Sequence, residues 1–90
     1  MTERTLEVTF LQGRMFAAYL YLGHRMGQKS AKMVPVDNGL MVIDYNADGL
    51  PYGIEITAPF AVPLRRLNEV LVQLGEPPLS DEESRSLQAA

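Results

Sequence analysis

The fold of this chain is decided by residues 42–56, which read Val42-Ile43-Asp44-Tyr45-Asn46-Ala47-Asp48-Gly49-Leu50-Pro51-Tyr52-Gly53-Ile54-Glu55-Ile56. The middle of this stretch suits a type I turn that ends on a glycine in the left-handed conformation, flanked by two β-strands. Asp48 and Gly49 are therefore expected to be structural turn residues. The turn places Asn46 opposite Leu50, and the same register would place Asp44 opposite Tyr52 and Val42 opposite Ile54.

That register assigns the hairpin side chains to two faces. One face would hold Met41, Ile43 and Tyr45 together with Gly53 and Glu55. Both faces of the hairpin are then largely apolar, whereas a sheet with one solvated face alternates between apolar and polar residues. The pattern indicates that both faces are covered.

Three further strands precede the hairpin. Residues 5–11 alternate between apolar and polar side chains, as in a half-buried strand. Residues 15–22 are apolar at nearly every position, which favours a central strand with Met15, Ala17, Tyr19 and Tyr21 on one side. Residues 30–36 form another strand that ends near Pro35. With the hairpin of residues 39–57, these segments predict a mostly antiparallel sheet of about five strands.

The period of the sequence changes after Pro63. Leucines recur at three- and four-residue steps from Leu64 to Leu74, which predicts an amphipathic helix. Gly75 is placed to end it in the left-handed conformation. Ser80-Asp81-Glu82-Glu83 reads as a capping box that begins a short acidic helix. The expected fold is a single α+β domain over residues 1–90, with the sheet in residues 5–57 and a helical extension in residues 63–90.

The hairpin also resembles the small bacterial domain of unknown function 2283 family, whose members read V-x-V-D-Y-D-x-x-G-x-x-x-G-I-E-I here. The matching residues are Asp44, Tyr45, Asp48, Gly49, Gly53, Ile54, Glu55 and Ile56, and Leu74-Gly75-Glu76-Pro77-Pro78-Leu79 resembles an extension found in some members. Phe10-Leu11 and Ala17 stand where family members often carry acidic residues, so any function of those acids is lost in this chain. The resemblance implies a fold but no activity.

Composition excludes several classes of protein. The chain has no cysteine, so disulfides, zinc-thiolate sites and thiol nucleophiles are absent, and its 47% hydrophobic content is that of a folded domain rather than a disordered one. The sequence has no apolar run of membrane-spanning length, and its first residues lack the features of a signal peptide. We therefore expect a cytoplasmic protein.

The titratable residues show no catalytic pattern. Asp44, Asp48 and Glu55 bring carboxylates to one hairpin, but the expected register directs Asp44 and Glu55 to opposite faces. His24 is the single histidine, and a loop position beside Arg25 suits a solvated side chain. We expect no catalytic residue, no cofactor and no metal site, and hence a protein that is not an enzyme.

Charge is divided unevenly between the two halves of the chain. Residues 1–36 carry five Lys or Arg residues and two acidic ones, while residues 37–90 carry three and nine. The basic group comprises Arg14, His24, Arg25, Lys29 and Lys32, and the sequence leaves open whether its loop part binds an anion. A net charge of −3 lacks the positive field of most nucleic-acid-binding domains, so nucleic acid is not the expected partner.

The function favoured by these observations is a non-enzymatic protein-interaction module that forms a homo-oligomer, because one leucine-striped helix covers one face of a sheet whose two faces both look apolar. Candidate interface residues are Phe16, Tyr19, Tyr21, Ile43 and Tyr45. One alternative is an antitoxin-like regulator that binds a toxin through its C-terminal helices. Another is a small-ligand-binding domain with a pocket lined by Tyr19, Tyr21, Tyr45 or Tyr52.

Overall fold

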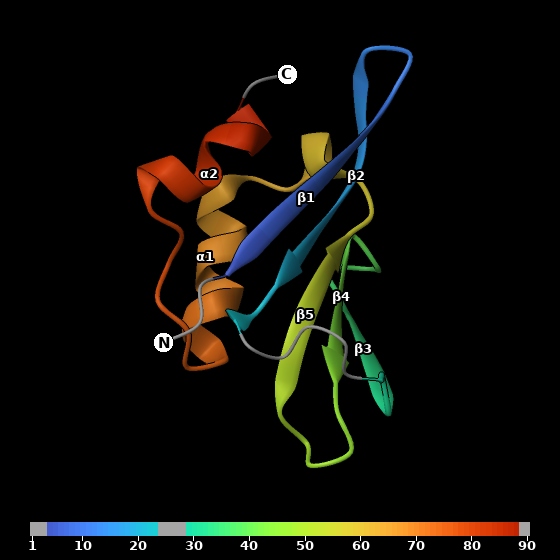
Figure 1. Ribbon diagram of the computed structural model, residues 1–90, viewed down its shortest axis with the longest axis vertical. Coiled ribbons are helices and arrows are strands. Elements are labelled where there is room, and N and C mark those ends of the chain that lie inside the picture. Colours follow the sequence, from blue (N-terminus) through green and yellow to red (C-terminus); the bar gives the residue numbers. More distant parts are fainter. Residues whose placement is uncertain (1–3, 24–28, 89–90) are drawn as a thin grey trace.

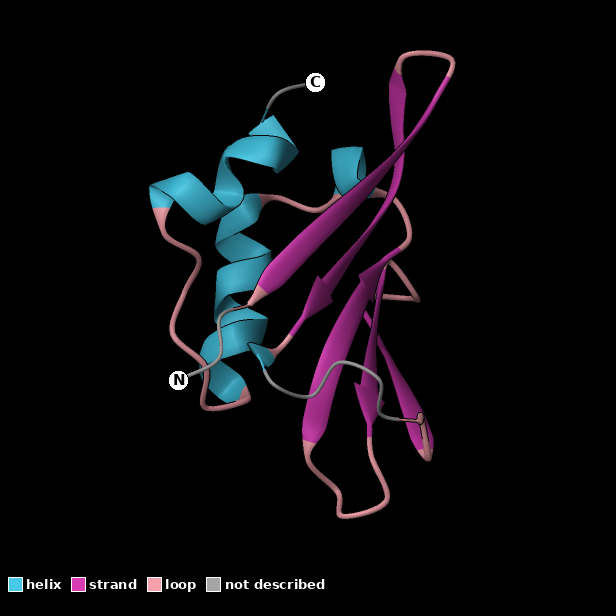
Figure 2. Ribbon diagram, viewed as in Figure 1, coloured by secondary structure: helices cyan, strands magenta, loops and turns pink. Residues whose placement is uncertain are grey.

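The computed structural model describes residues 4–23 and 29–88, which form one antiparallel sheet and helices packed on one of its faces (Figure 1). The elements are β1 (Thr5–Leu11), β2 (Arg14–Tyr21), β3 (Lys32–Val36), β4 (Met41–Tyr45), β5 (Pro51–Ile56), the 3₁₀ helix η2 (Pro59–Ala61), α1 (Leu64–Gln73) and α2 (Asp81–Gln88). The five strands are ordered β1-β2-β5-β4-β3 (Figure 2). The expected α+β class, with its sheet, amphipathic helix and short acidic helix, is confirmed.

The turn of the β4–β5 hairpin has the expected geometry. Gly49 has a φ of +80°, which is the left-handed conformation, and its amide donates to the Asn46 carbonyl over 3.0 Å. The Asn46 amide in turn donates to the Leu50 carbonyl over 2.9 Å. Tyr45 then pairs with Pro51, as the turn requires.

The register beyond this turn differs from the expected one by one residue. Asp44 pairs with Gly53 rather than with Tyr52, so Tyr52 is an extra residue that forms a β-bulge. Met41 and Ile43 therefore lie opposite Ile56 and Ile54 and share their face of the sheet. The expectation that Met41 and Ile43 share a face with Gly53 and Glu55 was wrong, because a one-residue shift moves each side chain to the other face.

A second irregularity occurs in the β1–β2 hairpin. Thr9 pairs with Ala17, but Phe10 pairs with Met15, so Phe16 has no opposite residue. Met15 consequently lies opposite Phe10, on the other face from Ala17, and it is buried. The sequence had placed Met15 on the face of Ala17 and the tyrosines, and this bulge is the reason that it is not there.

The core lies between α1 and the face of the sheet that carries aliphatic side chains. The strands contribute Ala18, Leu20, Met41, Ile43, Ile54 and Ile56, Leu22 follows directly after β2, and α1 adds Leu67, Val70 and Leu71. The helix ends as expected at a left-handed glycine, Gly75, with φ +81°. The Gly75 amide donates to Val72 and the Glu76 amide to Leu71, which satisfies two of the last helical carbonyls.

An ion pair connects α1 with the β3–β4 turn. Arg66 donates from Nε to Asp37 Oδ2 over 2.7 Å and from Nη2 to Oδ1 over 3.0 Å. Asp37 itself has a positive φ of 53°, a conformation that aspartate tolerates better than most residues. The two-pronged contact therefore holds the turn against the first part of the helix.

The capping box of α2 also forms as expected. The Ser80 amide donates to Glu83 Oε1 over 3.0 Å, and the Glu83 amide donates to Ser80 Oγ over 3.1 Å. The helix carries one leucine, Leu87, which packs against the core, and a second attachment comes from a charged residue. Arg4, ahead of β1, donates to both carboxylate oxygens of Glu83 at 3.0 and 2.8 Å and to the carbonyls of Pro77 and Pro78.

Candidate functional site

The face of the sheet opposite α1, here called the open face, carries tyrosines and acids instead of aliphatic residues. Tyr19 lies between Glu7 on β1 and Glu55 on β5, and Tyr21 lies between Thr5 and Gly53. The next strand, β4, contributes Val42 and Asp44 to the same face. The sequence had directed Asp44 and Glu55 to opposite faces, and the bulge at Tyr52 brings them to one.

A hydrogen bond between Tyr19 and Asp44 organises the centre of the open face. The Tyr19 hydroxyl donates to Asp44 Oδ2 over 2.5 Å, and Ser30 donates to Oδ1 over 3.3 Å. The Tyr19 ring crosses directly above Gly53, where a Cβ atom would lie only 2.2 Å from the hydroxyl oxygen. A glycine is needed at this position because any side chain would displace the ring.

The environment of Tyr19 disfavours ionisation of its hydroxyl. Burial raises the pKa of Tyr19 well above its ordinary value, and the hydrogen bond to Asp44 raises it further. The neighbouring ring of Tyr21 has its centroid 4.7 Å away, and a hydrogen bond to Glu7 raises the pKa of Tyr21. Both phenols therefore stay protonated at neutral pH, and they act as hydrogen-bond donors to carboxylates rather than as bases or nucleophiles.

The carboxylates of the hairpin lie in different environments. Asp44 is 8% exposed and accepts hydrogen bonds at both oxygens, while Glu55 and Asp48 are exposed. Across residues 4–23 and 29–88, no three His, Asp or Glu residues are arranged to hold a metal ion. The open face is thus built as a hydrogen-bonded surface.

In the turn, the side chain that bonds the backbone is that of Asn46. Its Oδ1 accepts from the Asp48 amide over 2.9 Å and from the Leu50 amide over 3.0 Å, and the residue is 8% exposed. Asp48, which the sequence predicted as a structural turn residue, lies two residues later and contributes its amide to this contact. An asparagine or aspartate at the first turn position commonly accepts from the amide two residues on, which was the available signal for Asn46.

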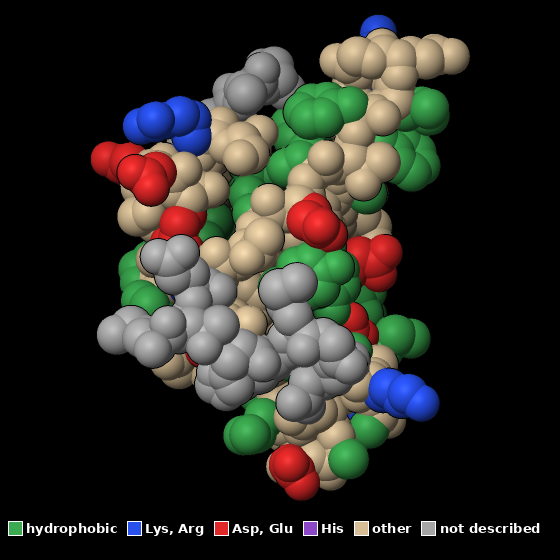
Figure 3. All heavy atoms as spheres, viewed as in Figure 1, with side chains coloured by type: hydrophobic (Ala, Val, Ile, Leu, Met, Phe, Trp, Pro, Cys, Tyr) green, Lys and Arg blue, Asp and Glu red, His purple; other side chains and the backbone are tan. Residues whose placement is uncertain are grey.

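Several of the large apolar side chains that are exposed lie at the projecting end of the β1–β2 hairpin. We define the hairpin patch as Phe10, Leu11, Phe16 and Phe60, which are 52%, 58%, 58% and 79% exposed. The first three lie next to the Gln12-Gly13 turn, and Phe60 lies on η2, which contacts β2. Figure 3 shows hydrophobic side chains gathered where this hairpin projects from the sheet.

The five candidate interface residues occupy three different environments. Tyr19 and Tyr21 lie together on the open face, and Phe16 belongs to the hairpin patch. Ile43 is 5% exposed in the core beneath α1, and Tyr45 packs partly buried against that core. The sequence missed Phe10, Leu11 and Phe60; the short Gln12-Gly13 turn and the prolines around Phe60 were the signals that could have indicated exposed apolar side chains.

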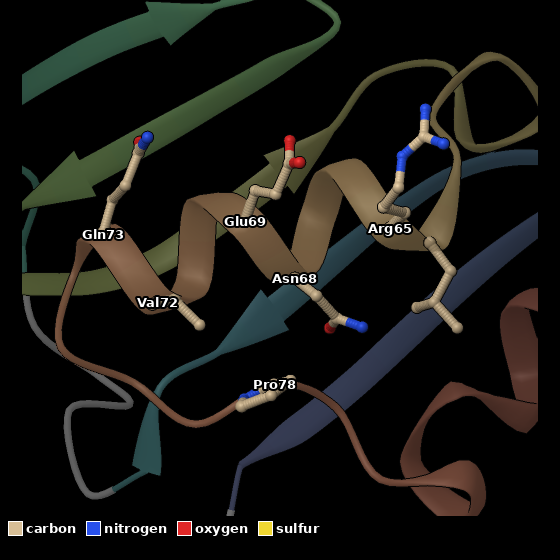
Figure 4. Close-up of a pocket in the computed structure, with 7 residues that line it drawn as sticks. Arg65, Asn68, Glu69, Val72, Gln73 and Pro78 are labelled. Atoms are coloured by element: carbon tan, nitrogen blue, oxygen red, sulfur yellow. The ribbon is translucent and has the colours of Figure 1, made fainter.

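A groove runs along the outer side of α1. It has a volume of about 1010 Å³ and is lined by Leu64, Arg65, Asn68, Glu69, Val72, Gln73 and Pro78. Asn68 and Val72 lie on the side of the helix nearer to the segment that carries Pro78 (Figure 4). Asn68 Oδ1 accepts from the Leu79 amide over 2.9 Å, so its polar group serves to fix that segment.

The basic residues of the N-terminal half are not gathered into one site by the described part of the chain. Arg14 is at the tip of the β1–β2 hairpin, whereas Lys32 is on β3, the far edge strand of the sheet. Lys29 is exposed in the segment that leads to β3. His24 and Arg25 lie outside the described residues.

Comparison of the chain with protein-family models, with curated proteins and with solved structures finds no match. The resemblance of the hairpin to the domain of unknown function 2283 family therefore stays a prediction. Among the helices in the described part of the chain, none combines the length and the apolar character needed to cross a membrane.

Proposed function

We propose that this protein is a small non-enzymatic interaction module that binds another polypeptide at the hairpin patch. The observation that carries the proposal is the gathering of Phe10, Leu11, Phe16 and Phe60 at one end of a 90-residue domain, each about half exposed or more. Clustered exposure of large apolar side chains is characteristic of protein-binding surfaces, whereas single exposed ones are common everywhere.

The chemistry of the open face supports an interaction role over catalysis. Tyr19 and Asp44 satisfy each other, and Tyr21 is bonded to Glu7, so the polar groups at the centre of this face are already engaged. A catalytic base needs to be within reach of a substrate proton and to have a pKa near neutrality. The two tyrosines have pKa values displaced away from that range.

The proposal extends to assembly, source and location. A chain of this length gains from burying surface against another chain, which favours a homo-oligomer. The family resemblance suggests a bacterial protein, and a cytoplasmic location is part of the same proposal. No nucleic-acid or membrane partner is part of the proposal.

A binding experiment with matched lysine variants tests the proposed function. The tagged chain is incubated with extract of its native cell, as wild type, as Phe16→Lys/Phe60→Lys and as Val72→Lys. Val72 is the control because it is 59% exposed on α1, away from the hairpin patch. We expect the same polypeptide to be retained by the wild type and by Val72→Lys, and lost with the double variant.

Circular dichroism establishes that the three proteins are equally folded. A polypeptide retained equally by all three would contradict the proposal, as would the absence of any specifically retained polypeptide.

A further inference from the structure

The three free strand edges of the sheet differ in how they are protected against pairing with another strand. The β3 edge contains Pro35 and begins with Lys32, two residue types that discourage strand addition. On β2, residues 14–17 extend beyond β5, but the bulge at Phe16 interrupts that edge. The outer edge of β1 has neither proline nor lysine, and its pairing with β2 has the extra residue on the β2 side. The helix α2 contacts β1 and lies beside its first residues, Thr5 and Leu6.

The hydrogen-bonding direction of β1 follows from its neighbours. Leu22 donates to Tyr52 on the β5 side, and this direction alternates along a strand, so Tyr21, Tyr19 and Ala17 bond toward β1. Their partners Thr5, Glu7 and Thr9 then bond toward β2. The peptide groups that point outward from the sheet are those of Leu6, Val8 and Phe10, because β1 is the first strand in the sheet order and has β2 as its one neighbouring strand.

We infer that this edge pairs with β1 of a second copy, antiparallel about a two-fold axis at Val8. Val8 of one copy lies opposite Val8 of the other, and Leu6 lies opposite Phe10. The three outward peptide groups of each copy then face one another as hydrogen-bonded pairs, which a two-fold axis permits without further adjustment. The result is a continuous ten-stranded antiparallel sheet across two molecules.

The side chains select this register over its neighbours. A register centred one residue earlier sets the two Glu7 carboxylates directly opposite each other, a like-charge pair that is destabilising. A register centred one residue later sets Leu6 opposite Gln12 in the turn, so the pairing of Leu6 with a strand residue of the second copy is lost. The Val8-centred register places each Glu7 opposite Thr9 of the second copy, and the half-exposed Phe10 packs beside a Leu6 that is only partly buried in the monomer.

The inference rests on the proposed function, because it names a second copy as one occupant of the hairpin patch. In the inferred dimer, Phe10 contacts the second copy. Phe16 and Phe60 are outside β1 and stay accessible to a different polypeptide. The two ideas can therefore fail separately.

Register-specific cross-linking tests the inference, and the natural absence of cysteine makes it direct. Glu7→Cys and Thr9→Cys proteins are each oxidised alone and then as an equimolar mixture. Directly opposite residues are within disulfide distance, whereas Glu7 and its own copy are diagonal neighbours about 7 to 8 Å apart, beyond ordinary disulfide geometry. We expect covalent dimer in the mixture at several times the yield of either protein alone.

Sedimentation of lysine variants gives an independent test. At micromolar concentration the wild type and Phe60→Lys are expected to be dimers, and Phe10→Lys a folded monomer, because its charge is buried opposite Leu6 of the second copy. The wild-type melting temperature should rise with protein concentration, as mass action requires.

A wild-type monomer across this concentration range would overturn the inference and the homo-oligomer part of the proposed function, and it would leave standing the binding of a different polypeptide at the hairpin patch. A dimer that cross-links equally in all three oxidised samples, or that persists in Phe10→Lys, would overturn it too by showing that the copies meet elsewhere. Loss of the dimer in Phe60→Lys would likewise place the contact on η2 instead of β1.

Discussion

The two faces of this sheet are built by the same strands but are stabilised by different chemistry. Beneath α1, adjacent strands present aliphatic side chains that are almost fully removed from water, such as Leu20, Ile54 and Ile56. On the open face, the same strands present tyrosines bonded to carboxylates, with Tyr19 lying across Gly53. The difference shows that one face depends on apolar burial and the other on a few directed polar contacts, so the two should respond differently to substitution.

The largest expected effect is on the covered face. Leu71 is fully buried, and Leu71→Ala should lower the free energy of unfolding by about 2 to 5 kcal/mol, because the substitution removes buried methyl groups and leaves a cavity. Val72→Ala, one position along the helix on its exposed side, should change it by less than about 0.5 kcal/mol. Urea denaturation of both variants makes the measurement. Equal losses would mean that α1 does not pack as described.

The open face should be most sensitive at Gly53. Gly53→Ala places a Cβ atom within the Tyr19 ring, so the ring must move and its bond to Asp44 is lost. We expect a loss of about 1 to 3 kcal/mol, as for other overpacked sites. In a Tyr19→Ala background the same change should cost much less, and a double-mutant cycle measures the coupling. If the losses of stability from the two substitutions were additive, the Tyr19 ring would not lie above Gly53.

The β4–β5 turn, which sets how these two strands pair, makes a smaller contribution to the stability of the fold. Gly49→Val should destabilise by about 1 to 2 kcal/mol, and Gly49→Asn by less, because asparagine adopts positive φ more readily than a β-branched residue. The space around Gly49 is open, so the difference comes from backbone conformation alone. Thermal melting of the two variants is sufficient, and identical melting temperatures would contradict the left-handed assignment.

The smallest expected effect is on the ion pair between Arg4 and Glu83, which attaches α2 to the start of β1. The Arg4 guanidinium holds the pKa of Glu83 below its ordinary value of 4.5. A carboxyl with a depressed folded-state pKa contributes stability above its unfolded pKa and loses it as the pH falls through the folded pKa. Wild-type stability should therefore decline below about pH 4.5 more steeply than that of Glu83→Gln, which keeps the capping box but does not titrate. If the free energy of unfolding fell equally steeply with pH in both proteins, the ion pair with Arg4 would contribute nothing to stability.

Elements that depend on local sequence could be predicted from the chain. The spacing of leucines predicted α1. Gly75 predicted where that helix ends, and Ser80 with Glu83 predicted where α2 begins. The turn that ends at Gly49 predicted which two strands form the hairpin. Each of these features is determined by residues within one or two turns of the backbone, so a short window of sequence contains the whole signal.

The bulges at Tyr52 and Phe16 could not be predicted in the same way. Each adds a residue to one strand in response to how the paired strands pack, and the strand composition is compatible with either register. The first bulge reassigned Ile43 and Asp44 between the faces, which changed the candidate site. The attachment of α2 was also hidden, because Arg4 and Glu83 are 79 positions apart.

That distance between Arg4 and Glu83 has a consequence for how the protein is made. The side chains of α2 line a small hollow with Leu6 on β1 and Leu20 on β2, so this part of the sheet is completed by a segment that is synthesised after all five strands. Contacts between segments that are far apart in the sequence form slowly during folding. A nascent or truncated chain that ends before Ser80 would therefore have its other strands available to pair while β1 keeps an uncovered apolar side. Such a product would be recognisable to proteases and chaperones as unfinished.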